Sequence, residues 1–335
     1  MQSRQSATML FDYVRIRFPT MDVQHIIRDI LKLNKDFMLH EDFGFYSYTE
    51  HYYIGDIFVL TSQDEEKGVL LELKGKGCRQ MESYLLAQER SWYDFLMDCL
   101  VDGGVMKRLD LAINDKAGIL DIPELTRKCD CEECISVFRS FKSYASGQLI
   151  KSHEQDKAGM GHTLYIGSLK SEVYFCIYEK DFEQYKKNDI PIEEAEVKNR
   201  FEIRLKNERA YYALRDLLAY DNPERTAFKI INRYVRFVDK DNTKPRSEWR
   251  ISEAWAWFIG ENRESMKLTT KPEPYSFQRT LNWLSHQVAP TLKVAMKLDE
   301  INQTQVVKDI IASAKLTERH EKILKQQAAT AKEVV

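Results

Sequence analysis

The clearest pattern of apolar and polar positions in this chain runs from residue 171 to residue 206. Apolar residues occupy alternate positions over 173–177 and again over 201–205. Successive side chains of a strand point to opposite faces, so this alternation predicts two strands, each with one apolar and one polar face. We interpret the segment between them as a helix followed by a loop. The polar faces carry tyrosine, lysine, arginine and glutamate, which makes this region a candidate platform for chemistry.

A third strand of the same kind is predicted upstream, over Met106–Asn114. Leucine and isoleucine alternate there with other residues, so Asp110 and Asn114 share one face with only the methyl group of Ala112 between them. That spacing is expected to leave room for an ion or a phosphate group. If the three strands are neighbours in one sheet, Asp110 projects from the same face as Glu202 and Tyr178.

The rest of the chain alternates between strand and helix patterns and then becomes purely helical. We expect strands at 10–18, 45–62, 68–75 and 162–168, helices at 23–33, 78–101, 122–142, 208–220, 223–238, 252–258, 277–298 and 306–327, a polar loop at 143–161 and a linker at 262–276.

This order predicts an α+β fold: an antiparallel-rich central sheet carrying the active site, with packed helices and a helical C-terminal part. We expect a catalytic sheet domain at 1–207, a helical part of the same domain at 208–262, and a linker with C-terminal helices at 263–335.

The composition is that of a globular protein, but it does not indicate which reaction or ligand the protein is built for. The 335 residues are 43% hydrophobic and 30% charged, with a net charge of −2, so no overall basic field indicates a nucleic acid partner. No apolar run reaches the roughly 20 residues needed to span a bilayer, and the first ten residues, MQSRQSATML, have no apolar stretch like that of a signal peptide, so we do not expect secretion. We therefore expect a cytoplasmic protein whose six cysteines are thiols.

Three of those cysteines, Cys129, Cys131 and Cys134, form the run CDCEEC. A C-x-x-C half-site can hold zinc, but here no second pair of cysteines and no nearby histidine completes it. A loop beside a helix is the favoured interpretation.

Asp110 and Glu202 are candidate metal ligands, and Tyr178 is a candidate nucleophile. Two carboxylates suit a hard divalent cation such as Mg²⁺ or Mn²⁺, and such an ion withdraws charge from a phosphate. A phenol titrates near ~10, so it needs nearby positive charge or a base to act as a nucleophile. The metal and Lys180 are expected to supply that charge.

Arg108 and Arg200 complete the candidate site as groups that orient and neutralise the phosphate. A purely structural interpretation stays open on the residues alone. In it, Tyr178 is an ordinary sheet tyrosine with a satisfied hydroxyl, and Asp110 and Glu202 form salt bridges to these two arginines.

Three motifs occur in one order: RLDLAIN at 108–114, TLYIGSLKSEVYFCIYEK at 163–180 and RFEIRLK at 200–206. They resemble the Rep_trans group of rolling-circle initiators and relaxases. The resemblance extends from Leu10 to about Lys325. It is closer to the MobT-type relaxases of integrative and conjugative elements in Gram-positive bacteria.

This resemblance implies a site-specific single-strand DNA endonuclease and strand transferase. It places the family's nucleophilic tyrosine at Tyr178 and its metal carboxylates at Asp110 and Glu202. It also implies an origin of transfer as the DNA partner, with a helicase, a coupling protein and an accessory processivity factor as expected partners.

The sequence departs from the family pattern in two respects. The family often has acidic residues where this chain has Asn114 and Arg204, so no third or fourth carboxylate ligand is expected. MobT-type proteins often begin with a helix-turn-helix domain, whereas this chain starts directly in the first strand. In addition, the seven histidines form no H-x-H pattern, so the two-histidine metal site of the HUH relaxases is not expected.

Two further features of the sequence bear on DNA chemistry. Tyr185 is a rival nucleophile on the helix after Tyr178. Lys229, Arg233 and Arg236 recur at i, i+4 and i+7 of the predicted helix, which gives a basic stripe suited to phosphate contact or to solvent.

The sequence thus predicts a metal-dependent enzyme that nicks and rejoins one DNA strand at an origin. Tyr178 attacks the scissile phosphate, which leaves a free 3′-hydroxyl and the protein on the 5′ end. A plasmid replication initiator with the same chemistry stays open, and a DNA-binding regulator with a degenerate site is the alternative from another class.

Overall fold

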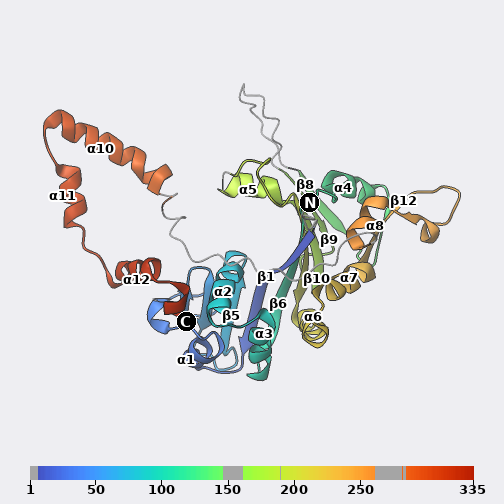
Figure 1. Ribbon diagram of the computed structural model, residues 1–335, viewed down its shortest axis with the longest axis horizontal. Helices are drawn as coiled ribbons and strands as arrows, with labels where there is room; N and C mark the ends of the chain where they lie inside the picture. The colour runs from blue at the N-terminus through green and yellow to red at the C-terminus, as the bar shows by residue number, and fades with distance from the viewer. Residues whose placement is uncertain (1–6, 146–160, 189, 261–280, 282–283) are drawn as a thin grey trace. The chain divides into compact units, whose positions relative to one another are not determined.

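The computed structural model describes residues 7–145, 161–188, 190–260, 281 and 284–335. The chain forms two compact units (Figure 1). The first comprises residues 1–17 and 103–270, and the second comprises residues 18–102 and 271–335. The predicted boundaries after residues 207 and 262 divide the chain by function, and that division stays a prediction.

The first unit contains the predicted catalytic strands. Its elements are β1 (Ala7–Phe18), β6 (Val105–Asp115), α4 (Ile122–Asp130), β7 (Cys134–Ser136), β8 (Phe141–Ala145), β9 (His162–Ile166), β10 (Val173–Glu179), α5 (Lys180–Asn188), β11 (Asn199–Lys206), α6 (Asn207–Tyr220), α7 (Pro223–Tyr234), β12 (Val235–Asp239), η3 (Arg246–Glu248), β13 (Arg250–Ile251) and α8 (Glu253–Ile259).

The main sheet of this unit is antiparallel, with the described strands in the order β1, β6, β11, β10, β9, β8. The three strands with alternating sequence patterns are therefore neighbours, as the hypothesis of a shared face requires. β10 and β9 run side by side in Figure 1, and β11 lies between β10 and β6. A smaller sheet has the order β13, β12, β7.

Helices cover the apolar face of the main sheet. Phe201 of β11 is fully buried, and its ring lies 5.2 Å from Phe175 of β10, 5.5 Å from Phe258 and 6.2 Å from Trp255, both on α8. Such close aromatic packing fixes the positions of the strands relative to the helices, because each large ring excludes alternative positions for its neighbours. The opposite face of the same strands carries the polar residues.

The second unit combines a meander with helices from both of its chain segments. Its elements are α1 (Val23–His25), η1 (Ile26–Ile30), η2 (Lys35–Phe37), β2 (Leu39–Glu41), β3 (Glu50–Ile54), β4 (Ile57–Thr61), β5 (Val69–Lys74), α2 (Lys76–Ala87), α3 (Trp92–Val101), η4 (Leu284–Val288), α10 (Ala289–Asn302), α11 (Val306–Ser313), α12 (Glu318–Ala328) and α13 (Ala331–Val334).

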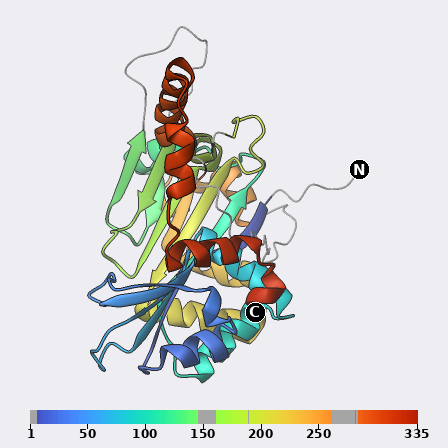
Figure 2. The same ribbon diagram turned by 90° about the vertical axis from the view of Figure 1, so that its left-hand side faces the viewer.

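The end of the chain packs onto the start of this second unit. Gln326 of α12 donates a 2.7 Å hydrogen bond to the carbonyl oxygen of Phe37, and the backbone N–H of Asn34 donates to the carbonyl of Val334 at 2.8 Å. Figure 2 shows the red C-terminal helix α12 beside the blue strands of the meander. These results confirm the predicted α+β fold with a helical C-terminal part.

Several predicted helices are wrong in extent, including 306–327, which forms the two helices α11 and α12. The predicted helix 78–101 is two helices, because Glu89 has a φ of 55° and Ser91 starts a new helix through a capping box with Asp94. The predicted helix 122–142 ends at Asp130, and the chain then enters β7 and β8. The predicted loop 143–161 accordingly begins inside β8, and most of it lies outside the described residues.

The predicted helix 223–238 is also too long. It ends at Tyr234, and Val235 begins the strand β12, which pairs with β7 and β13. The predicted linker 262–276 lies outside the described residues. None of the helices in the described parts of the chain is long and apolar enough to cross a membrane.

Candidate active site

The register of the sheet aligns the predicted site residues in rows across three strands. One row joins Tyr178, Arg200 and Asn114; the next joins Cys176, Glu202 and Ala112; the third joins Tyr174, Arg204 and Asp110. Directly paired residues point to the same face of a sheet, so all nine side chains share one face. In the row through Ala112, Glu202 is paired with the small residue beside which the sequence predicts room for an ion; that expectation stays a prediction.

Tyr178 and Glu202 are in direct contact. The phenol of Tyr178 donates a 2.8 Å hydrogen bond to Oε1 of Glu202. Burial, reinforced by the charge of Glu202, raises the pKa of Tyr178 well above its ordinary value. The phenol is therefore a neutral hydroxyl at neutral pH, and it needs a proton acceptor when it attacks.

A chain of alternating charges extends from Glu202 across the sheet. Arg204 donates from Nε and Nη2 to Oε2 of Glu202, at 2.9 and 2.6 Å, and its Nε lies 3.8 Å from Oδ2 of Asp110. Arg108 binds Asp110 in a bidentate manner, with Nε to Oδ1 at 2.9 Å and Nη2 to Oδ2 at 2.6 Å. Glu202 and Asp110 are only 3% and 2% exposed, so each buried carboxylate is balanced by a guanidinium.

Burial and the neighbouring arginines shift the pKa of Asp110 in opposite directions. Burial raises the pKa of Asp110 to about 6, although the Arg108 guanidinium favours the ionised form. The purely structural interpretation predicts salt bridges from Asp110 to Arg108 and from Glu202 to Arg200. The first forms, whereas the second is wrong, because Glu202 binds Arg204.

Arg200 instead links β11 to β6 and β1. Its Nε donates to Oδ1 of Asn114 at 2.8 Å, and its Nη1 donates to Oδ1 of Asp12 at 2.9 Å. Asp12 lies at an irregularity in the β1–β6 register, between Phe11 and Tyr13. The guanidinium is thus held in place within the row that contains Tyr178.

Lys180 follows directly after β10, at the start of α5. Its ammonium group lies 5.6 Å from the centre of the Tyr178 ring and forms an ion pair with Glu183. Burial and the charge of Arg200 lower the pKa of Lys180. Burial alone would raise the pKa of Glu183, but the positive charges of Lys180 and Lys187 outweigh it and lower that pKa to about 2.

The donor chemistry of Asp110 and Glu202 fits a hard divalent cation. Each carboxylate has about four lone-pair positions. Three of those on Glu202 accept hydrogen bonds from Tyr178 and Arg204, and two on Asp110 accept from Arg108. Both carboxylates thus keep open positions, but arginines already supply the neutralising charge that an ion would bring.

The comparisons with known proteins agree with one another. Residues 104–311 match the family model described as replication initiation factor, Rep_trans, and residues 8–98 match the model of the rolling-circle replication initiation protein N-terminal domain. The chain is 44% identical over 316 residues to the protein named "Putative DNA relaxase NicK" of Bacillus subtilis (strain 168), which covers 94% of this chain and 88% of that protein.

The chain belongs to the Rep_trans family. Relaxases and rolling-circle initiators of this kind are DNA nicking–joining enzymes. The fold agrees: the rolling-circle replication initiator protein from Geobacillus stearothermophilus matches with a TM-score of 0.67 at 22% identity, over 79% of this chain and 99% of that one. β6, β10 and β11, which carry the site, all lie inside the Rep_trans match.

The Rep_trans match also contains the other candidate residues for DNA chemistry, Tyr185, Lys229, Arg233 and Arg236. Tyr185 lies on α5 and is 46% exposed. Lys229 forms a 3.2 Å ion pair with Asp216, and Arg236 lies on β12, so the three basic residues do not form one helical stripe. Their role in DNA binding stays a prediction.

The sequence patterns did not indicate Asp12 or Glu183 as members of this site. The alternation places Arg204 on the face of Glu202, but its contact with Glu202 was not predicted. Glu183 lies three residues after Lys180, which is a helical ion-pair spacing. Asp12 has no such signal.

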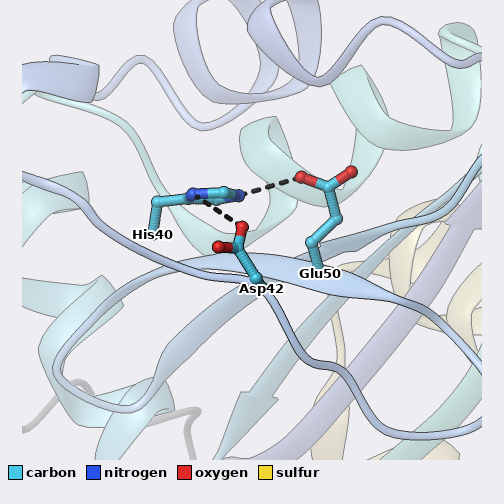
Figure 3. A group of neighbouring side chains, drawn as sticks. All are labelled: His40, Asp42 and Glu50. Carbon is cyan, nitrogen blue, oxygen red and sulfur yellow. Dashed lines mark hydrogen bonds and ion pairs between the residues drawn. The ribbon is translucent and has the colours of Figure 1, made fainter.

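A separate group of possible metal ligands lies within the rolling-circle N-terminal match (Figure 3). Nε2 of His40 contacts Glu50 at 2.9 Å, and Nδ1 of His40 lies 3.7 Å from Asp42. The two carboxylates thus approach different nitrogens of one imidazole ring. An ion can take only one ring nitrogen of a histidine, so this arrangement suits an exposed histidine–carboxylate cluster better than a metal site.

Proposed function

We propose that this chain is a relaxase: a site-specific endonuclease and strand transferase that nicks one DNA strand at an origin of transfer and starts rolling-circle-type conjugative transfer. The observation that carries the proposal is the contact between Tyr178 and Glu202 on the polar face of the sheet. It gives a Rep_trans protein a tyrosine hydroxyl with a carboxylate in position to accept its proton.

In the proposed reaction, Oη of Tyr178 attacks the scissile phosphorus while its proton passes to Oε1 of Glu202. The bond between phosphorus and the 3′ oxygen breaks, and the 3′ oxygen leaves as a hydroxyl after taking up a proton. The 5′ phosphate stays attached to Tyr178, so the energy of the phosphodiester is conserved. Rejoining is the reverse attack by a 3′-hydroxyl on the phosphotyrosine.

The cations around Tyr178 are placed for a phosphate whose negative charge grows in the transition state. Arg200 is fixed at two points by Asn114 and Asp12, and the ammonium of Lys180 lies over the Tyr178 ring. Preorganised positive groups of this kind act strongly because they need no reorientation during the reaction. Lys180, with its lowered pKa, is also suited to protonate the departing 3′ oxygen.

Asp110 and Glu202 are the proposed ligands of a divalent metal ion, Mg²⁺ or Mn²⁺. When bound, such an ion would withdraw charge from the scissile phosphate. Arg108 and Arg204 hold the two carboxylates in place whether or not the ion is present. Metal dependence, the role in conjugation and a helicase and coupling protein as partners all belong to this proposal.

The test is a nicking assay on labelled single-stranded oligonucleotides that tile the origin region of the element encoding the protein. Wild type, Tyr178→Phe, Glu202→Ala and Tyr185→Phe are compared with Mg²⁺, Mn²⁺ or EDTA. We expect a covalent protein–DNA band that Tyr178→Phe loses and Tyr185→Phe keeps. A band that persists in Tyr178→Phe would move the nucleophile to another tyrosine.

A plasmid replication initiator with the same chemistry is the second candidate. It is favoured by the description of the family as replication initiation factors. Deletion of the gene separates the two, because loss of transfer supports the relaxase and loss of plasmid copies supports the initiator. A regulator without catalysis would bind origin DNA and leave it uncut in every metal.

A further inference from the structure

The polar face that carries Tyr178 continues outward to the edge of the sheet. Tyr178 is paired with Thr163 of β9, and Thr163 is paired with Tyr144 of β8. In the neighbouring row, Tyr165 of β9 is paired with Lys142 of β8. All of these side chains therefore point to the side of the sheet on which the nucleophile lies.

The two tyrosines form an open aromatic surface there. The rings of Tyr144 and Tyr165 lie 5.9 Å apart at 87°, in an edge-to-face arrangement. Tyr144 is 53% exposed although it is a large aromatic residue in a strand, and Tyr165 is half-buried. Tyr165 of β9 is a diagonal neighbour of Tyr178 on β10, and diagonal neighbours in paired strands generally lie about 7–8 Å apart.

Positive charge accompanies the aromatic rings. Lys142 is exposed, and it has no ion-pair partner within the described parts of the chain. On the inner side, the guanidinium of Arg204 lies 5.9 Å from the ring of Tyr165. We call Lys142, Tyr144 and Tyr165 the edge strip.

Alternating aromatic and basic side chains are the usual means of binding a single strand, because unpaired bases stack on the rings and the phosphates contact the cations. A paired base offers no free face to such rings. We infer that the edge strip binds unpaired nucleotides next to the scissile phosphate, with a base stacked on Tyr144 and a phosphate near Lys142. This inference rests on the proposed nicking at Tyr178.

The test uses an oligothymidylate of about 20 nucleotides, and Tyr178→Phe as the parent so that no DNA is cut. Base stacking on an aromatic residue is worth roughly 1–3 kcal/mol, so Tyr144→Ala is expected to weaken binding by about 5- to 150-fold. Tyr144→Phe keeps the ring and is expected to bind like the parent. Tyr144→Leu keeps apolar bulk against Tyr165 without a π face, and it is expected to bind as weakly as the alanine variant.

Tyr220→Ala is the matched control, because Tyr220 is 58% exposed but lies at the end of α6, away from the edge strip. It is expected to leave binding unchanged. Lys142→Ala is expected to lower the slope of log affinity against log salt by about 0.7, the value for one phosphate contact on a single strand. Duplex DNA of the same length is expected to show no dependence on Tyr144.

Parent-like affinity in both Tyr144→Ala and Tyr144→Leu would overturn the inference. So would a change in oligomeric state on gel filtration that accounts for the lost affinity, because the edge strip would then be a contact between two copies of the chain. The proposed function is tested separately by the covalent band of the variants with Tyr178 intact. If the wild type forms the band but the Tyr144 variants bind oligothymidylate as the parent does, only the role of the edge strip is refuted. If the wild type forms no band, the nicking function is refuted.

Discussion

Tyr178 and Glu202 lie on adjacent strands, and the hydroxyl of the tyrosine is bonded to a carboxylate oxygen at 2.8 Å. The other oxygen of Glu202 is held by two N–H groups of Arg204. One oxygen is thus fixed by the protein, and the one facing the nucleophile can take up a proton. Glu202 is therefore a candidate general base as well as a candidate metal ligand.

Replacement of Glu202 by glutamine tests that role. Glutamine keeps the shape and can still accept the phenol's hydrogen bond, but it cannot take its proton. We expect single-turnover nicking to slow by about 10²–10⁴-fold, the usual contribution of a positioned acid or base, with DNA binding retained. If the loss came only from weaker metal binding, excess Mn²⁺ would restore the rate, and that result would contradict the base role.

Arg200 is expected to be a positioning residue whose shape matters as much as its charge. Lysine cannot reach both Asn114 and Asp12, so Arg200→Lys leaves a buried amide oxygen without a donor. We expect the free energy of unfolding to fall by about 1–3 kcal/mol in urea titrations. Nicking should fall through kcat more than through KM, whereas equal losses in both would show a general distortion of the sheet.

The ionisation of Asp110 predicts a pH dependence of stability in EDTA. Its pKa is about 6 in the folded protein and 3.8 for an ordinary aspartate. A raised folded pKa means that the folded state binds the proton more tightly, so the stabilisation is fully present below pH 3.8 and is lost as pH rises through 6. The shift corresponds to about 3 kcal/mol.

Asp110→Asn removes this titration while keeping the shape of the side chain. We therefore expect the wild type to lose more free energy of unfolding between pH 4 and pH 7 than the variant does, by about 2 kcal/mol of the full shift. Urea unfolding of both proteins at several pH values measures the difference. Parallel pH curves would show that Arg108 keeps Asp110 ionised throughout this range.

The sheet and the shared face of the site were predictable because strand alternation is a strong local signal. Leu109, Leu111 and Ile113 alternate so regularly that the opposite face of β6 follows directly. The prediction assumed that the three strands are neighbours, and the structure confirms this. The site's core residues, Tyr178, Glu202 and Asp110, are brought together as the alternation indicated.

Other parts depend on interactions that alternation does not record. Asp12 reaches Arg200 from an irregularity in β1, where the register with β6 shifts between Phe11 and Tyr13 and Asp12 has no partner in the pairing. The helix that was predicted to continue to Val238 ends because Val235–Asp239 pairs with β13 and with β7, and β7 lies about 100 residues earlier in the chain. Pairing of this kind overrides local helical periodicity.

Gly167, in the turn between β9 and β10, is expected to be intolerant of a side chain. Its φ is 97°, and an added Cβ would lie 2.9 Å from Cδ1 of Phe138 and 3.2 Å from Cβ of Tyr174. Gly118 has a φ of 74°, but there the nearest atom to an added Cβ is 3.8 Å away, on Lys198. The two glycines thus share a positive φ and differ in crowding.

Both alanine variants should therefore lose stability, but Gly167→Ala should lose more. We expect a loss of about 1 kcal/mol for Gly118→Ala from the backbone alone, and a further 1–3 kcal/mol or so for Gly167→Ala from the contacts with Phe138 and Tyr174. Urea unfolding of the two variants measures the difference. Because Tyr174 shares a face with Tyr178, Gly167→Ala should also slow nicking, whereas equal losses of stability in the two variants would show that the turn absorbs the added methyl group.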